Sequence, residues 1–189
     1  EPLSDGMVKK EEDKQRYYGI IHHETLRLSR LIDDMLELSK LQSRTLAFKM
    51  YPFDLNNLLT DLETKFYPVM ADAGIKFNVV FHTGELPTVM GNSDRVEQIL
   101  VILLDNAKKY TPSGGSITIS AEYNNIVDKV FISVVDTGQG IHEYDINHIF
   151  DRFFKADRAR GKKGTGLGLA IVKHICVLTN GELILSSQE

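Results

Sequence analysis

KVFISVV, residues 129–135, runs directly into DTGQGI, residues 136–141, so an acidic residue and two glycines follow an apolar run. The run has the length and composition of a strand. An ionised carboxylate only accepts hydrogen bonds. Asp136 at the strand end can therefore accept a hydrogen bond from the amino group of adenine, whereas the guanine carbonyl has no proton to donate to it. Gly138 and Gly140 let the backbone turn away while a ligand lies against it. An ordinary Asp-Gly turn is the alternative interpretation.

Strands and helices interleave on both sides of this junction. Apolar alternation predicts strands at 45–53, 75–81, 115–123, 129–136 and 181–187. Helical periodicity predicts helices at 54–74, 91–112, 142–150 and 166–179, the third of them short, and the helix at 91–112 is expected to start at a Ser or Asp signal. This order favours an α+β fold, an α/β sandwich in which helices cover one face of a sheet.

A second candidate motif lies on the helix before Pro112. In LLDNAKKY, residues 103–110, Asn106, Lys109 and Tyr110 are spaced i, i+3 and i+4 and therefore share one face. An amide oxygen can bind Mg²⁺, an ammonium can neutralise phosphate, and an aromatic ring can pack on a purine. A polar helix end with a solvated lysine would show the same pattern.

A third motif is GTGLGLAI, residues 164–171, which leads into a helix. Gly164, Gly166 and Gly168 remove side chains where free N–H groups can bind an anion, and Thr165 adds a hydroxyl. The preceding loop, KADRARGKK, has five basic residues against one acidic residue and could fold over a triphosphate. Such a charge run is also typical of solvated surface, and the glycine spacing matches neither a P-loop nor a dinucleotide fingerprint.

The N-terminal part predicts one long helix at 11–42. Its apolar stripe is broader than a two-helix seam needs, which indicates a helical bundle whose other helix is missing or comes from another chain. We therefore expect a homodimer through this helix.

Composition restricts the partners and the compartment. A net charge of -4 lacks the cationic face that general nucleic-acid binding needs. The single cysteine, Cys176, indicates a reducing, cytoplasmic environment. No apolar run approaches the roughly 20 residues of a membrane span, so we expect no direct membrane contact; if the parent protein is membrane-anchored, its anchor lies elsewhere.

The order of the motifs resembles the catalytic domain of sensor histidine kinases. LLDNAKKY, DTGQGI, IFDRFFKAD and GTGLGLAIVKHI follow one another as the N, G1, F and G2 boxes of that family, and the resemblance runs from about Phe53 to the C-terminus. RLSRLIDDMLELSKLQS, residues 27–43, looks like the second helix of the family's dimerisation and phosphotransfer hairpin. The implied domains are 1–46, a partial helical region, and 47–189, an ATP-binding catalytic domain with the histidine-kinase, gyrase and chaperone type of fold.

The resemblance implies roles for individual residues. Asn106 matches the Mg²⁺ ligand and, with Lys109, the catalytic positions, and Asp136 matches the residue that recognises adenine. The lid would span about 142–163, anchored by the F-box residues Phe150, Arg152, Phe153 and Phe154. The remaining implied nucleotide contacts are Tyr110, Gly138, Gly140, Ile141, Lys163, Gly164, Thr165, Gly166, Leu167 and Gly168.

The implied activity is transfer of the γ-phosphoryl group of ATP, with Mg²⁺, to a histidine and then to a response-regulator receiver domain. Departures from the family leave two alternatives: a catalytically silent nucleotide-binding or dimerisation module, and an ATPase of the gyrase and chaperone group. Ile102 replaces an additional N-box Asn, and no HELRTP-like acceptor motif occurs. His22 and His23 fit the second-helix pattern better than an acceptor site, so we expect poor self-phosphorylation. The sequence stops early, at SSQE, which indicates a fragment whose last strand is missing.

Overall fold

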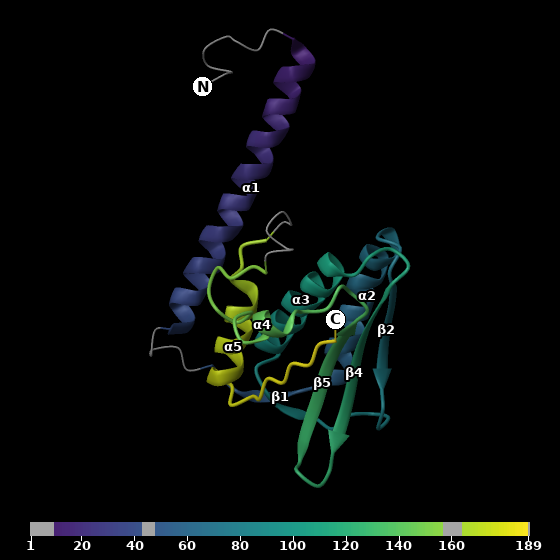
Figure 1. Ribbon diagram of the computed structural model, residues 1–189. Coiled ribbons are helices and arrows are strands. Elements are labelled where there is room, and N and C mark those ends of the chain that lie inside the picture. Colours follow the sequence, from purple (N-terminus) through teal and green to yellow (C-terminus); the bar gives the residue numbers. More distant parts are fainter. Residues whose placement is uncertain (1–9, 43–47, 157–163, 189) are drawn as a thin grey trace.

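The computed structural model describes residues 10–42, 48–156 and 164–188. A long helix, α1 (Glu11–Gln42), extends away from an α/β unit and contacts it only near its C-terminal end (Figure 1). At 1.5 Å per residue, such a helix is about 48 Å long. The predicted helix at 11–42 is confirmed, whereas the predicted domain boundary between residues 46 and 47 lies outside the described residues.

The α/β unit contains two small sheets. Strands β2 (Lys76–Phe81), β4 (Ser116–Asn124) and β5 (Lys129–Asp136) form a sheet in the order β2-β4-β5, with β2 parallel and β5 antiparallel to β4. Two short strands, β1 (Tyr51–Phe53) and β3 (Val89–Gly91), form a separate antiparallel pair. The helices are α2 (Leu55–Asp72), α3 (Ser93–Tyr110), α4 (Glu143–Ile146) and α5 (Gly168–Leu178). The predicted α+β sandwich is confirmed.

Local hydrogen bonds explain where the two central helices begin. Asp54 caps α2 by accepting hydrogen bonds from the backbone N–H groups of Asn56 and Asn57. Asn92 caps α3 by accepting from the N–H of Arg95, so the predicted start at Ser or Asp is corrected by one or two residues. Gly74, at φ +69°, ends the α2 segment in the left-handed region that glycine favours.

The main core lies between the sheet and the helices α2 and α3. Ile117, Ile119 and Ala121 alternate along β4 toward the helices and are fully buried. They belong to one cluster with buried side chains of α2 and α3, among them Leu59 and Leu104. Burying each large aliphatic side chain contributes roughly 1.5–3 kcal/mol. This packing holds the C-terminal end of α3 beside the end of β5.

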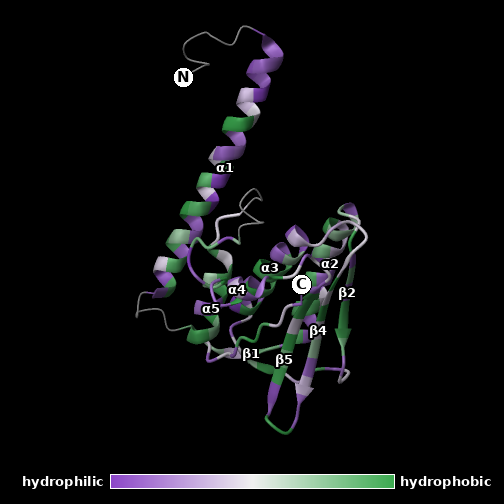
Figure 2. Cartoon of the chain, viewed as in Figure 1, coloured by the Kyte–Doolittle hydropathy of each residue, from purple (hydrophilic) through white to green (hydrophobic). Residues whose placement is uncertain are grey.

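A second apolar cluster joins α1 to the α/β unit. Leu38 and Leu41 of α1 pack with Ile171 and Ile175 of α5, and Ile102 of α3 packs against them. The helix therefore finds a partner within this chain at its C-terminal end. Figure 2 shows that apolar residues continue along α1 beyond this contact. No helix in the described part of the chain combines the length and the apolar character that a membrane crossing requires.

Three predicted elements differ from the observed ones, and one observed strand was not predicted. The strand predicted at 45–53 is reduced to β1, with residues 43–47 outside the described part, and the helix predicted at 142–150 contains only the four residues of α4. The short strand β3 was not predicted. The strand predicted at 181–187 is wrong, because this segment forms no ladder with β5.

The segment at 181–187 nevertheless keeps the alternation that suggested a strand. Leu183 and Leu185 are 37% and 38% exposed, whereas Ile184 between them is 79% exposed. The segment is tied by side chains: Lys129 donates to Glu182, and Ser187 Oγ accepts from the N–H of Ile141 at 2.8 Å. The side chains of this segment thus alternate between more covered and more exposed positions, although its backbone makes none of the strand pairing that defines a β-strand.

Candidate functional site

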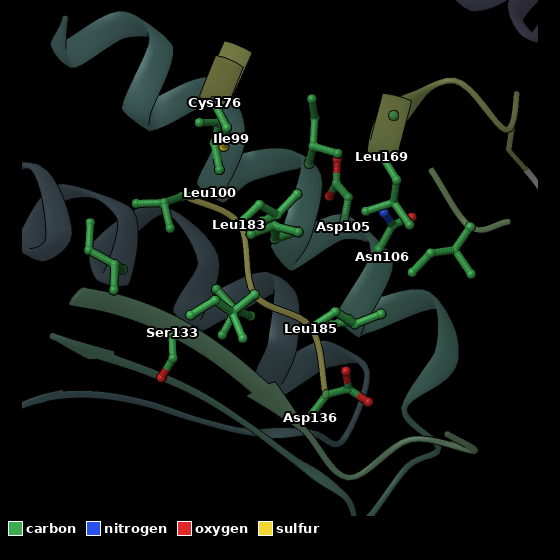
Figure 3. A pocket seen from close by; sticks show the side chains of 18 of the residues that line it. Ile99, Leu100, Asp105, Asn106, Ser133, Asp136, Leu169, Cys176, Leu183 and Leu185 are labelled. Atoms are coloured by element: carbon green, nitrogen blue, oxygen red, sulfur yellow. The ribbon is translucent and has the colours of Figure 1, made fainter. Parts of the chain in front are cut away.

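The candidate site is a cleft between the last turns of α3, the end of β5 and the loop that leads into α5. Figure 3 shows Asn106 on α3 beside Leu169, with Asp136 on the opposite side of the cleft at the end of β5. Leu183 and Leu185 of the C-terminal segment also line the cleft (Figure 3). Four segments from different parts of the sequence therefore meet here.

Asp136 is held in place by the turn that follows it. Its Oδ1 atom accepts a hydrogen bond of 2.8 Å from the N–H of Gly138. A Cβ atom on Gly138 would lie 2.5 Å from the same oxygen and 3.0 Å from the carbonyl oxygen of Tyr110. Gly140 adopts φ +70°. The glycines thus allow the strand end to pack against the end of α3 with the Asp136 carboxylate facing the cleft.

The end of α3 supplies an amide, an ammonium and a phenol. The Lys109 ammonium donates to the Tyr110 hydroxyl at 2.8 Å and lies 4.6 Å from the centre of its ring. A Cβ atom on Gly164 would lie 2.9 Å from Lys109 Nζ, so the ammonium rests directly on the glycine loop. Asn106, Lys109 and Tyr110, for which the helical spacing predicted a shared face, all lie on α3 and line the cleft.

The glycine loop is attached to the segment that follows α4. Gly166, at φ +78°, accepts a backbone hydrogen bond of 2.9 Å from Phe153, which itself adopts φ +62°. A Cβ atom on Gly166 would lie 2.8 Å from the Phe153 carbonyl carbon. Gly166 of the GTGLGLAI motif and Phe153 of the IFDRFFKAD motif therefore pack backbone to backbone, and only glycine fits at this contact.

Thr165, between two of these glycines, uses its hydroxyl in two hydrogen bonds. It donates to Asp34 Oδ2 of α1 at 2.6 Å and accepts from the N–H of Leu167 at 3.3 Å. Leu167 is fully buried in the cluster between α1 and α5. Its side chain therefore packs beneath the loop, and a contact of Leu167 with the nucleotide stays a prediction.

Positive charges gather near the glycine loop. Partial burial lowers the pKa of the Lys155 ammonium below its usual value, and the charges of Lys109 and Arg27 lower it further. Arg27 and Arg30, on α1, line the cleft as well. These groups give one end of the cleft the character of an anion-binding site.

Most of the residues predicted for the site are brought together. Those whose side chains or backbone line the cleft are Asn106, Lys109, Tyr110, Asp136, Gly138, Gly140, Ile141, Phe150, Gly164, Thr165, Gly166 and Gly168. Lys163 and residues 157–162 of the predicted lid lie outside the described residues. Asp34, Arg27 and Arg30 could not be predicted as site residues, because no local pattern places one helix beside a loop more than 100 residues away.

The chain matches the family described as histidine kinase-, DNA gyrase B-, and HSP90-like ATPase over residues 91–189. It is 31% identical to the sensor histidine kinase WalK of Bacillus subtilis (strain 168), an alignment that covers 100% of this chain and 31% of WalK. The chain thus spans about a third of the length of the curated relatives that it matches.

Solved structures agree with this similarity. The structure of full-length ShkA in complex with AMPPNP superposes with a TM-score of 0.75 at 27% identity, covering 90% of this chain and 35% of ShkA. Histidine kinase ThkA in complex with response regulator protein TrrA superposes with a TM-score of 0.65 at 29% identity, covering 79% of this chain and 42% of that one. The chain belongs to the histidine kinase-, DNA gyrase B- and HSP90-like ATPase family, and the relatives that it resembles along its whole length are sensor histidine kinases.

Proposed function

We propose that this chain is the ATP-binding catalytic part of a sensor histidine kinase, which transfers the γ-phosphoryl group of ATP to a histidine. The observation that carries the proposal is the meeting of Asn106, Asp136 and the glycine loop in one cleft. The similarity to ShkA, whose structure contains the ATP analogue AMPPNP, supports ATP as the ligand.

Each part of the cleft has a role in this proposal. The Asp136 carboxylate accepts a hydrogen bond from the amino group of adenine, and Tyr110 packs beside the nucleotide. Lys109 and the N–H groups of the glycine loop neutralise and orient the phosphates, with Lys163 contributing from the lid. Catalysis would consist of positioning and charge stabilisation, with no covalent group supplied by this part of the protein.

Mg²⁺ fits the donor groups at the site. The described residues contain no cluster of three or more His, Cys, Asp or Glu side chains that could hold a metal by themselves. Mg²⁺ bound with a nucleotide usually takes only one or two protein ligands and completes its shell with phosphate oxygens and water. The Asn106 amide oxygen would be that ligand, and the ion would supply charge neutralisation for the phosphates.

The partners follow from the same proposal. The complex of ThkA with TrrA supports a response-regulator receiver domain as the next acceptor of the phosphoryl group. The parent protein would be membrane-anchored, with this part in the cytoplasm; the thiol of Cys176, buried and unpaired with its pKa raised by burial, suits a reducing compartment. Residues 1–46 would form the partial dimerisation region and residues 47–189 the catalytic domain.

Two measurements test the proposed function together. Calorimetric titration should show Mg-ATP binding more tightly than Mg-GTP, and labelled ATP should transfer phosphate to an added helical hairpin that carries an acceptor histidine. Binding without transfer would favour a silent nucleotide-binding module. Steady hydrolysis without transfer would favour an ATPase. Ile102 argues against an ATPase, because it occupies the position where those enzymes need a Glu as the general base that activates water. Its side chain also packs closely on Gly168, where an added Cβ atom would lie 3.0 Å from Ile102 Cγ2.

Gly138→Ala should weaken Mg-ATP binding by about tenfold, which corresponds to about 1.4 kcal/mol. The added Cβ atom would lie 2.5 Å from Asp136 Oδ1 and would displace the carboxylate. The turn lies outside the buried core, so the fold should be retained. Gly19→Ala is the matched control, because this glycine lies outside the cleft on α1 and its Cβ would meet nothing within 4 Å. Equal affinities of both variants in calorimetry would contradict the assigned role of this turn.

The homodimer is proposed to form through α1. Exposed apolar side chains on this helix include Ile21, Leu28, Ile32 and Leu36, each about half exposed. A second copy of the helix would remove this surface from water. Light scattering should show a concentration-dependent dimer, and the double substitution Ile21→Glu and Leu28→Glu should yield a monomer that still binds Mg-ATP. A wild-type monomer at all concentrations would refute the dimer.

A further inference from the structure

Helix α1 makes a polar contact with the candidate phosphate loop that the nucleotide site itself does not require. Asp34 Oδ2 accepts a hydrogen bond of 2.6 Å from the Thr165 hydroxyl, and both side chains are partly buried. Thr165 is separated from Asp34 by 131 residues in the sequence. The contact therefore links the helical region directly to the cleft.

Neighbouring contacts hold α1 in the position that allows this hydrogen bond. The Glu37 carboxylate accepts a hydrogen bond from the Arg95 guanidinium, which also donates to Gln98 and lies 4.8 Å from the centre of the Phe48 ring. One turn further along, Leu38 and Leu41 pack in the cluster with α5. Asp34, Glu37, Leu38 and Leu41 are spaced i, i+3, i+4 and i+7, so one face of α1 makes all of these contacts.

The contact opposes the binding of a polyphosphate at the loop. The Thr165 hydroxyl donates to Asp34 and accepts from the N–H of Leu167, so in this arrangement neither that proton nor that amide is directed at a ligand. In addition, the Asp34 carboxylate places a negative charge beside the loop. It would repel the negative phosphates, and the repulsion is stronger than in open water because the site is partly buried. Lys109 lies at the loop, and Lys155 is close enough to Lys109 for that charge to lower its pKa, so Asp34 offsets part of the attraction that these cations exert on a phosphate.

We propose that the contact between Asp34 and Thr165, called the latch below, lets the position of α1 control the affinity of the glycine loop for the triphosphate of ATP. With α1 docked as observed, Asp34 holds Thr165 and lowers that affinity. A movement of α1 that separates Asp34 from Thr165 releases the hydroxyl and the Leu167 amide and removes the repulsive charge. The inference rests on the proposed function, since it takes ATP as the ligand of the cleft.

Asp34→Asn tests the latch because it removes the charge and replaces the carboxylate by a neutral amide oxygen, which accepts a weaker hydrogen bond from Thr165. Affinities for Mg-ATP and for adenosine are measured by calorimetry on the 189-residue chain. We expect Asp34→Asn to tighten Mg-ATP binding by about 5- to 20-fold, within the usual range of coupling between sites. Adenosine affinity should stay unchanged, because adenosine has no phosphate to meet the loop. Asp33→Asn is the matched control: it makes the same charge change at the adjacent, exposed position of α1.

A second comparison separates the latch from a general effect of charge. In a Thr165→Val background the hydrogen bond is absent and only the charge of Asp34 remains, so Asp34→Asn should raise the ratio of Mg-ATP to adenosine affinity by a clearly smaller factor than in the wild-type background. An unchanged ratio for Asp34→Asn in the wild-type background would overturn the latch, as would an equal increase in both backgrounds or in Asp33→Asn. Failure of the wild-type chain to bind either ligand would instead contradict the proposed function.

Discussion

Asn106→Ala is expected to slow phosphoryl transfer to an added acceptor hairpin by about 10²- to 10³-fold, the effect typical of losing one electrostatic contact in a preorganised site. Asn106 lies in the last turns of α3, where the buried neighbours Leu104 and Ala107 fix the helix against the sheet. Its side chain lines the cleft, and its amide oxygen is the proposed protein ligand for Mg²⁺. Alanine removes that oxygen, while the helix should remain intact because alanine has the highest helix propensity.

Single-turnover transfer from labelled ATP, at saturating nucleotide, is the measurement for Asn106. Asn106→Asp is a useful comparison, because it keeps an oxygen ligand at the same place and should retain more transfer activity than alanine. Asn78→Ala, on the outer face of β2, is the control for a loss of an amide elsewhere. Transfer by Asn106→Ala at the wild-type rate would remove this residue from the catalytic machinery.

Asp136→Ala is expected to weaken Mg-ATP binding by roughly 10- to 100-fold, because one hydrogen bond to a charged group is lost at about 1.5–3 kcal/mol. The selectivity for Mg-ATP over Mg-GTP should fall at the same time, since the carboxylate is the proposed group that distinguishes the adenine amino proton from the guanine carbonyl. The loss of affinity and the loss of selectivity have one physical cause, so they should appear together.

Competition titrations with Mg-ATP and Mg-GTP measure both effects of the Asp136 substitution. Asp61→Ala removes an exposed carboxylate from α2, outside the cleft, and should change neither affinity nor selectivity by more than about twofold. If Asp136→Ala loses affinity for both nucleotides equally, Asp136 supports the turn without selecting the base.

The elements that are specified locally could be predicted from the sequence. α2 begins at a capping Asp54 and its segment ends at Gly74, and the apolar patterns of residues 115–123 and 129–136 predicted the strands β4 and β5. The spacing of Asn106, Lys109 and Tyr110 likewise depends only on helix geometry. Capping, periodicity and turn preferences act over a few residues, so they can be recognised without knowledge of the tertiary contacts.

The pairing of strands could not be settled in this way. The segment 181–187 alternates as a strand should, yet a strand exists only when its backbone pairs with a neighbour. Here the side-chain contacts of Glu182 and Ser187 hold the segment near β5 without a ladder. The short strand β3 shows the converse, since three residues carry too little local signal and are defined by their pairing with β1.

The sequence by itself determined the long helix, the α+β class, and the three motifs whose residue types suit a purine, a metal and phosphates. Only the tertiary structure decided that these motifs share one cleft and that α1 returns to it through Asp34. The physical reason is the range of the interactions: a cap or an apolar period is satisfied within a few residues, whereas the hydrogen bond from Thr165 to Asp34 exists only after α1 and α5 have packed through Leu38, Leu41 and Ile171.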